Sequence, residues 1–209
     1  MNDEMLRETL PVEQRLALAY APAAVRGNLL AVMALDTRLA KVFAAAREPI
    51  IGQLRLAWWR DRLGEGARPP RGEPLLDYIA ARPLDRAVLG DLVDAWEGLL
   101  GDPASGPLDG LAGARARAIL GAAGTKADAP AALAAAREWA LADLARLPGD
   151  LGDLAAGMSA ALPWRPARLP RTLRSLAVLH AMARSARRRG GNGGPGSILV
   201  VLRVGLLGI

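Results

Sequence analysis

The chain has 209 residues, a length that fits one domain burying about 70% of its unfolded surface, so that no disulfide or metal is needed to hold it together. It contains no cysteine, which excludes disulfides, thiolate nucleophiles and zinc sites with sulfur ligands. The net charge of +6 is unevenly distributed: no acidic residue follows Asp153, whereas nine arginines do, so the last quarter of the chain is a basic module.

The N-terminus indicates no export, because residues 1–4 are acidic and no apolar run of secretory length follows them. The longest apolar stretch, 198–209, is interrupted by Arg203 and is shorter than the roughly 20 residues that a spanning helix needs. We therefore expect a cytoplasmic protein, with peripheral attachment to the inner face of a membrane as an additional expectation.

Two consecutive helices are predicted in the first third of the chain. Apolar residues recur at three- and four-residue steps from Leu29 to Phe43, which predicts an amphipathic helix over 23–46. Pro49 interrupts it, since proline disfavours helical geometry at the preceding residue and suits the first turn of a new helix. That second helix is predicted over 49–63, where glycines follow.

The remainder of the chain continues the helical pattern after a loop predicted at 64–74. Nothing alternates with a period of two for long enough to predict a sheet, and no repeat of 20 to 50 residues supports a solenoid. We expect an all-α bundle, with residues 1–189 as the helical domain and 190–209 as a glycine-rich linker and tail of the same domain. Helices are predicted at 84–100, 108–121, 130–147, 151–162 and 169–188, and 197–207 fits either a terminal helix or a strand.

Few residues suggest catalysis. His180 is the only histidine and lies on an alanine-rich helix, so we interpret it as structural or exposed, not as a metal ligand or a member of a triad. Three groups of carboxylates have a spacing that could hold a divalent cation, but they are interleaved with glycine, proline or arginine, and a solvated surface is the favoured interpretation. These groups are Asp61 with Glu65, Glu73 with Asp77, and Asp91 with Asp94 and Glu97.

The segment 53–62 is the most unusual part of the sequence, because two tryptophans and three arginines share about three helical turns. One interpretation is structural: Trp58 and Trp59 anchor the core while the arginines pair with acidic neighbours. The other is functional: the arginines line a cavity that receives an anionic group.

The same segment carries a resemblance to a known family. Pro22 with Arg26, Leu35-Asp36 and the run Arg47-Glu48-Pro49-x-x-Gly52-x-x-Arg55-Leu56-x-Trp58-Trp59-Arg60-Asp61 look like the N-terminal third of squalene/phytoene synthase-family proteins. The likeness is to their divergent branch, which is similar to a mitochondrial assembly factor for respiratory complex I. It resumes at 139–146, 173–177 and 194–203, and so covers most of the chain discontinuously.

The resemblance implies a shortened isoprenoid-synthase-like helical bundle. Family enzymes join two prenyl diphosphates head to head, with two aspartate-rich motifs on facing helices that hold magnesium against the leaving diphosphate. In place of the first motif, residues 38–44 read Arg-Leu-Ala-Lys-Val-Phe-Ala, without a carboxylate. In place of the second, Asp143 and Arg146 remain but Leu147-Pro148 follows them. Both metal sites are therefore expected to be degenerate.

We assign no catalytic residue and no metal ligand, and the patch and the resemblance together give seven candidate ligand-binding residues: Arg26, Arg55, Trp58, Trp59, Arg60, Asp61 and Arg146. The favoured hypothesis is a non-catalytic or altered family member that acts as a binding or assembly protein without a cofactor. Its expected partners are a prenyl diphosphate or lipid, or a protein in complex assembly.

Two alternatives are open. The first is an active prenyl transferase of isoprenoid, carotenoid or squalene biosynthesis, which would need magnesium held by displaced carboxylates such as Asp61, Glu65, Asp91 and Asp94. The second is a basic protein whose arginines along 165–189 bind an anionic membrane surface. Nucleic acid is disfavoured as a partner, because aromatic residues make up only 4% of the chain and stacking is weakly supported.

Overall fold

The structure is a computed structural model, and the residues described are 3–64, 66, 72–101, 104–125, 129–164, 167–188 and 204–205. This part of the chain contains helices and no strand, which confirms the all-α prediction. The elements are, in chain order, α1 (Asp3–Glu8), α2 (Val12–Ala19), α3 (Ala23–Ala44), α4 (Pro49–Leu63), α5 (Pro74–Ala80), α6 (Arg86–Glu97), α7 (Ser105–Ala122), α8 (Pro130–Leu144), α9 (Asp150–Ala161), the single 3-10 turn η1 (Arg171–Leu173) and α10 (Arg174–Arg188).

The helices begin and end where the residues at their ends favour it. The bounds of α4 are those predicted, because Pro49 opens the helix and Gly64 follows it. Helix α6 begins two residues later than predicted. Asp85 caps it, since its Oδ1 accepts hydrogen bonds from the backbone N–H groups of Ala87 and Val88 at 2.9 and 3.4 Å.

Three short helices, α1, α2 and α5, were not predicted. They have six, eight and seven residues, about two turns each, too few for an apolar period to stand out from the sequence. The predicted helix 169–188 is a 3-10 turn after Pro170 followed by α10. The linker and tail predicted at 190–209 fall outside the described residues, apart from Val204 and Gly205.

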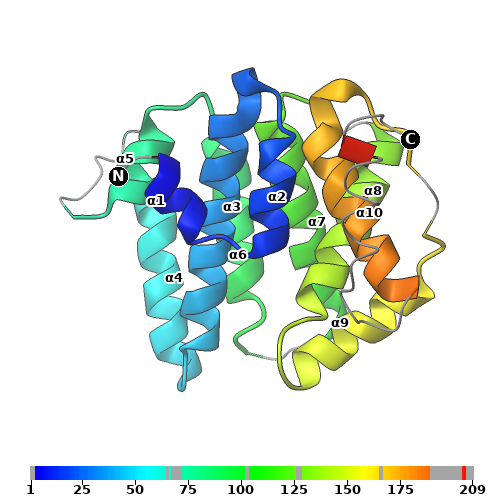
Figure 1. Cartoon of the computed structure of the whole chain (residues 1–209). Coiled ribbons are helices and arrows are strands. Elements are labelled where there is room, and N and C mark those ends of the chain that lie inside the picture. The colour runs from blue at the N-terminus through cyan, green and yellow to red at the C-terminus, as the bar shows by residue number, and fades with distance from the viewer. Residues whose placement is uncertain are drawn as a thin grey trace.

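Helices α3 and α7 form the centre of the bundle (Figure 1). Helix α3 packs against α1, α2, α4, α5, α6 and α7, and α7 packs against α3, α6, α8 and α9. Helix α4 lies at one side of the molecule and α8 and α10 lie at the other (Figure 1). The two sides are therefore connected mainly through α3, α6 and α7.

Helix α7 is buried on almost every side, as expected for a helix built largely from alanine, leucine and glycine in the middle of a bundle. Its buried residues include one charged side chain, Arg115. A search of the described helices for one long and apolar enough to cross a membrane finds none. The finer assignment of an isoprenoid-synthase-like bundle stays a prediction.

Candidate functional site

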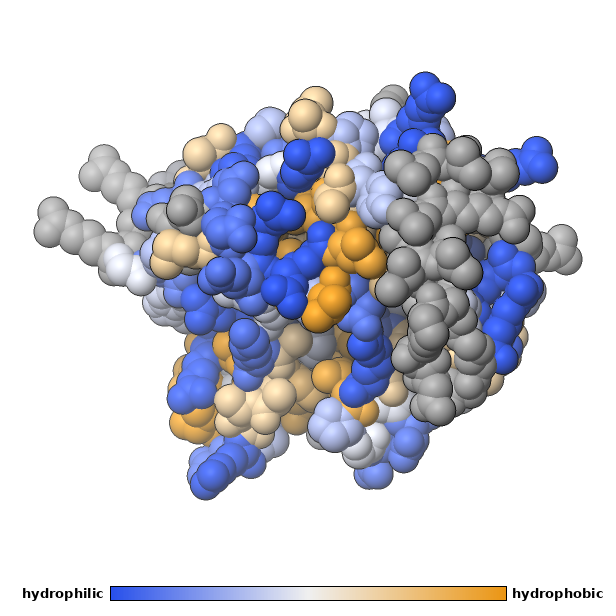
Figure 2. All heavy atoms as spheres, viewed as in Figure 1, coloured by the Kyte–Doolittle hydropathy of each residue, from blue (hydrophilic) through white to orange (hydrophobic). Residues whose placement is uncertain are grey.

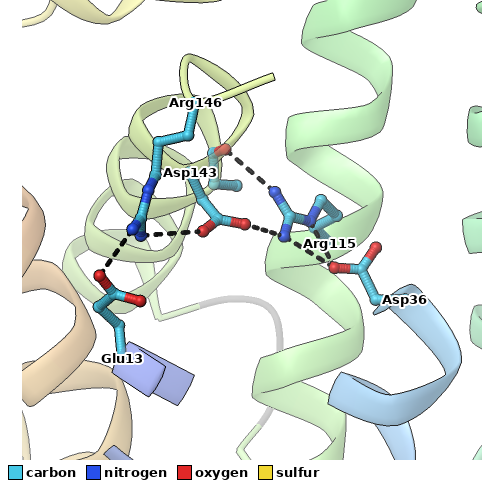
Figure 3. Close-up of polar contacts among 6 residues, drawn as sticks. Glu13, Asp36, Arg115, Asp143 and Arg146 are labelled. Carbon is cyan, nitrogen blue, oxygen red and sulfur yellow. Dashed lines mark hydrogen bonds and ion pairs between the residues drawn. The ribbon is translucent and has the colours of Figure 1, made fainter. Parts of the chain in front are cut away.

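A chain of alternating charges runs from the centre of the bundle towards its surface (Figure 3). Its centre is Arg115 on α7, whose guanidinium lies between a carboxylate of α3 and one of α8. The Nε–H of Arg115 donates to Oδ2 of Asp36 at 2.8 Å, and an Nη2–H donates to Oδ2 of Asp143 at 2.5 Å. Its Nη1–H donates to the carbonyl oxygen of Ala140 at 3.1 Å. One guanidinium thus joins three helices.

The neighbours of this buried ion pair leave few of its polar atoms unsatisfied. The indole Nε1–H of Trp96, on α6, donates to Oδ1 of Asp36 at 2.9 Å. The guanidinium carbon of Arg115 lies 4.9 Å from the centre of the Trp139 ring. Burial on its own would lower the pKa of Arg115, but the charges of Asp36 and Asp143 outweigh it and raise that pKa above its ordinary value. Arg115 is therefore a permanent cation in the core.

The outer end of the chain of charges involves Arg146, which follows α8, and Glu13 of α2. An Nη2–H of Arg146 donates to Oε1 of Glu13 at 2.6 Å, and its Nη1 lies 4.0 Å from Oδ1 of Asp143. Partial burial would raise the pKa of Glu13, but the hydrogen bond from Arg146, a backbone hydrogen bond and the charge of Arg146 together outweigh burial and lower that pKa. The side chain of Arg146 is 56% exposed, so the chain of charges reaches solvent here.

Next to this outer end lies a cleft of about 370 Å³ among α2, α8, α9 and α10. Six alanines line it, and their short side chains leave the space that larger residues would fill. Leu179 and Met182 complete an apolar wall, and polar groups come from both rims. The cleft is lined by Glu13, Trp139, Ala142, Asp143, Ala145, Arg146, Ala156, Ser159, Ala160, Leu179, Met182, Ala183, Ala186 and Arg187. This volume is within the usual range of small-molecule sites.

Three arginines gather at the C-terminal end of α10, beside the cleft. Arg187 donates an Nη2–H to the carbonyl oxygen of Ala160 at 2.9 Å, and its guanidinium lies 5.5 Å from the centre of the Trp164 ring. Burial, and then the positive charge of Arg188, lower the pKa of Arg184. The Nε of Arg184 is buried without a hydrogen-bond partner among the described residues. Positive charge is thus concentrated here, and within the described ranges no carboxylate forms an ion pair with these arginines, although the charge of Glu138 partly offsets that around Arg184.

A second buried polar contact joins α10 to α8. Nε2 of His180 and Oε2 of Glu138, on α8, are joined by a hydrogen bond of 2.5 Å. The imidazole is stacked on the Trp164 ring, with ring centres 5.6 Å apart, and the Nε1–H of Trp164 donates to the carbonyl oxygen of Ser159 at 2.7 Å. The prediction that His180 is structural or exposed is confirmed in its structural form, since the residue is 3% exposed.

The burial of His180 makes the stability of the protein sensitive to mild acid. Burial, only partly opposed by Glu138, lowers the pKa of His180 below its usual 6.5. The unfolded chain therefore binds more protons than the folded one below pH 6.5, and the free energy of unfolding falls as the pH falls through that window. Between pH 7.5 and 5.5 we expect wild type to lose up to about 1.4 kcal/mol more than His180→Gln does, measured by urea unfolding at both pH values. Equal losses in the two proteins would contradict this assignment.

The candidate residues on α4 do not form one site with Arg146. Helix α4 packs against α3 and α6, whereas Arg146 follows α8 on the far side of the bundle. Trp59 is buried, and Arg60 forms ion pairs with Asp94 and Glu97 of α6. Both observations match the structural interpretation of the tryptophan and arginine patch.

The other candidates lie at the surface or brace the backbone. Arg55 and Asp61 are exposed, and Trp58 is 37% exposed, with its ring against the edge of Trp59. Arg26 donates two hydrogen bonds, from Nε and Nη2, to the carbonyl oxygen of Ala21, at 3.2 and 2.8 Å, and so braces the turn between α2 and α3. Of the seven candidates, Arg146 alone lines the cleft.

Sequence reasoning missed the residues at the centre of the site, Asp36, Arg115 and Glu138, as candidates. Each of them is a charged residue flanked on its helix by buried apolar residues, and that position is the signal that could have identified them. The spaced carboxylates were the more visible feature. In the structure, Asp94 and Glu97 pair with Arg60, Glu73 pairs with Arg38, and Asp91 lies 3.9 Å from Arg117.

Within the described ranges, no group of three or more histidine, aspartate or glutamate side chains is arranged to hold a metal ion. Comparisons of the chain with models of protein families, with curated proteins and with solved structures find no match. The site offers an apolar cleft with cationic groups at its rim, next to a buried ion pair that joins α8, one of the helices forming the cleft, to α3 and α7.

Proposed function

We propose that the protein is a non-catalytic binding protein of the squalene/phytoene synthase type, which holds an amphiphile with an apolar chain and an anionic head group. The observation that carries the proposal is the cleft, whose wall of alanine, leucine and methionine ends at Arg187. An apolar chain buried there is stabilised by the hydrophobic effect, and the arginines of α10 can form charge-assisted hydrogen bonds with a phosphate.

The buried ion pair supports the non-catalytic part of the proposal. Prenyl transfer in the family that the sequence resembles needs carboxylates on facing helices to hold magnesium. Here Asp36 and Asp143 come from α3 and α8, which both pack against α7, and the guanidinium of Arg115 lies between the two carboxylates at hydrogen-bond distance from both. A divalent cation at that position would have to displace a permanently charged side chain from between the two carboxylates.

The charge distribution favours an anionic head group over a neutral one. Arg146 is already shared between Glu13 and Asp143, so its charge is largely balanced. Arg184, Arg187 and Arg188 have no carboxylate in an ion pair with them among the described residues, and burial together with repulsion from Arg188 lowers the pKa of Arg184. A bound phosphate would relieve that repulsion.

Calorimetric titration with geranylgeranyl diphosphate, without magnesium, tests the proposal, and geranylgeraniol is the probe without the charge. We expect the diphosphate to bind more tightly than the alcohol. Arg187→Gln should weaken diphosphate binding roughly tenfold, the effect of one charge-assisted contact. Ala186→Trp should abolish binding of both probes, because the indole fills the cleft.

Arg55→Gln is the matched control, since Arg55 is an exposed arginine on the opposite side of the bundle. It should bind both probes as wild type does, and circular dichroism of each variant checks that the helices are retained. Absence of diphosphate binding by the folded wild type would overturn the proposed ligand. Formation of a head-to-head product on addition of magnesium would instead establish the prenyl transferase alternative.

A further inference from the structure

Helix α4 has two apolar faces, of which the bundle covers only one. Gly52, Leu56, Trp59 and Leu63 are buried against α3 and α6. The second face, called here the outer α4 face, consists of Ile50, Ile51, Leu54 and Trp58, which are 62, 41, 64 and 37% exposed. Four of the six large apolar residues that are exposed in the described part of the chain therefore lie on this one helix.

The four residues of the outer α4 face lie on one side of the helix. Successive residues of an α-helix are turned by about 100°, so positions 50, 54 and 58 follow one line along the helix, with Ile51 beside it. This line extends over more than two turns of a helix at the edge of the molecule. Figure 2 shows apolar residues at the lower left, over the lower part of α4, with hydrophilic residues around them. A planar surface can contact all four side chains at once.

Cations border this face. Arg55 and Arg62 are exposed and lie between the outer and the buried faces of α4, and the guanidinium of Arg62 is 5.9 Å from the centre of the Trp58 ring. Lys41 and Arg47 are exposed near the turn from α3 to α4. Two exposed carboxylates, Glu48 and Asp61, lie in the same region, so the six charged groups together carry a net charge of +2.

We propose that the outer α4 face binds the surface of an anionic lipid bilayer, with α4 parallel to the membrane plane. An apolar line of this kind enters the head-group region, where the indole of Trp58 is favoured, and arginines beside it reach the phosphates. Each cation near such a surface contributes about 1 kcal/mol.

The size of the patch favours a membrane over a protein partner. Four partly exposed side chains, none larger than about 250 Å², offer less apolar area than the ~800 Å² that each partner gives to a standard protein interface. A membrane needs no complementary shape and continues beyond the patch, so the cations around it also take part. This proposal rests on α4 alone and does not depend on a ligand in the cleft.

The tryptophans supply an internal probe. The chain has five tryptophans, of which Trp58 is the one that a surface can reach. The other four are at most 6% exposed: Trp59, Trp96, Trp139 and Trp164. On addition of vesicles of phosphatidylcholine with phosphatidylglycerol, we expect the emission of wild type to shift to shorter wavelength and the protein to float with the vesicles. Vesicles of phosphatidylcholine alone should bind it more weakly, and added salt should reduce binding to the anionic ones.

The test variant combines Ile50→Gln with Leu54→Gln, two exposed positions where glutamine maintains helix propensity. It should bind anionic vesicles roughly tenfold more weakly, because both side chains lose their apolar contact with lipid. Val12→Gln is the matched control, since Val12 is 63% exposed on α2, and Arg187→Gln tests the arginines of α10. Both should bind as wild type does.

Three results would overturn the proposal. One is a wild type that does not float with anionic vesicles at low salt. Another is binding that Arg187→Gln abolishes and the α4 double variant leaves unchanged, which would assign the membrane contact to α10. The third is self-association in solution that the double variant removes while vesicles remain unbound, which would make the outer α4 face an interface between two copies of the chain.

Discussion

Arg115→Ala is expected to lower the free energy of unfolding by about 3–5 kcal/mol, the usual cost of breaking a buried ion pair by removal of one partner. The substitution leaves the carboxylates of Asp36 and Asp143 in the core without their cation, and it removes the donor to the carbonyl oxygen of Ala140. Chemical unfolding followed by circular dichroism measures the change. Arg117→Ala is the control on the same helix: its side chain is 44% exposed and 3.9 Å from Asp91, so we expect a change within about 0.5 kcal/mol.

A triple variant separates the effect of charge from that of packing. Asp36→Asn, Arg115→Met and Asp143→Asn together remove every charge of the buried part, and the amide oxygen at position 36 still accepts the hydrogen bond of Trp96. Since hydrophobic residues of similar size often replace a buried ion pair without loss, and no charge is left stranded here, the stability lost in Arg115→Ala should return in part, reduced by the cost of the unpaired amide N–H groups of the two asparagines. A triple variant as unstable as the single one would show that packing, not stranded charge, sets the cost.

The helices were predictable where one residue type decides the local backbone. Proline at 49 and glycine at 64 fix the limits of α4 whatever the rest of the chain does. Apolar periodicity was sufficient for α3 because the helix has 22 residues. It was insufficient for α2, whose eight residues are held by their contacts with α3 and α10. Such contacts are a property of the assembled bundle and leave no local pattern.

The candidate site was less predictable, because a charge in a sequence does not show its partner. Asp36 and Arg115 are 79 positions apart, and their pairing depends on how α3 and α7 cross. The patch on α4 was recognised as unusual, but the sequence does not show which of its adjacent tryptophans faces the core. The cleft depends on alanines, and in the sequence an alanine that leaves a space looks the same as one that packs closely.

Trp59→Ala is expected to cost more stability than Trp58→Ala, whereas lipid binding should depend on Trp58 and not on Trp59, although the residues are neighbours. Trp59 is 4% exposed and packs into the core, so its truncation should cost about 3–5 kcal/mol of unfolding free energy. Trp58 is 37% exposed, and its loss should cost about 1 kcal/mol, chiefly from its edge contact with the Trp59 ring, whose centre is 5.3 Å away. Urea unfolding followed by circular dichroism measures both changes without depending on the tryptophan signal.

Lipid binding should follow the reverse order. Trp58→Ala removes an aromatic group from the outer α4 face and should weaken binding to phosphatidylglycerol-containing vesicles, whereas Trp59→Phe, a milder change that maintains the core, should bind as wild type does. If both tryptophans proved equally costly to stability and neither affected vesicle binding, the double tryptophan would be a core anchor alone. If Trp58→Ala weakened binding while the fold stayed intact, one dipeptide would serve two surfaces: the second indole holds α4 on the bundle, and the first presents it to the membrane.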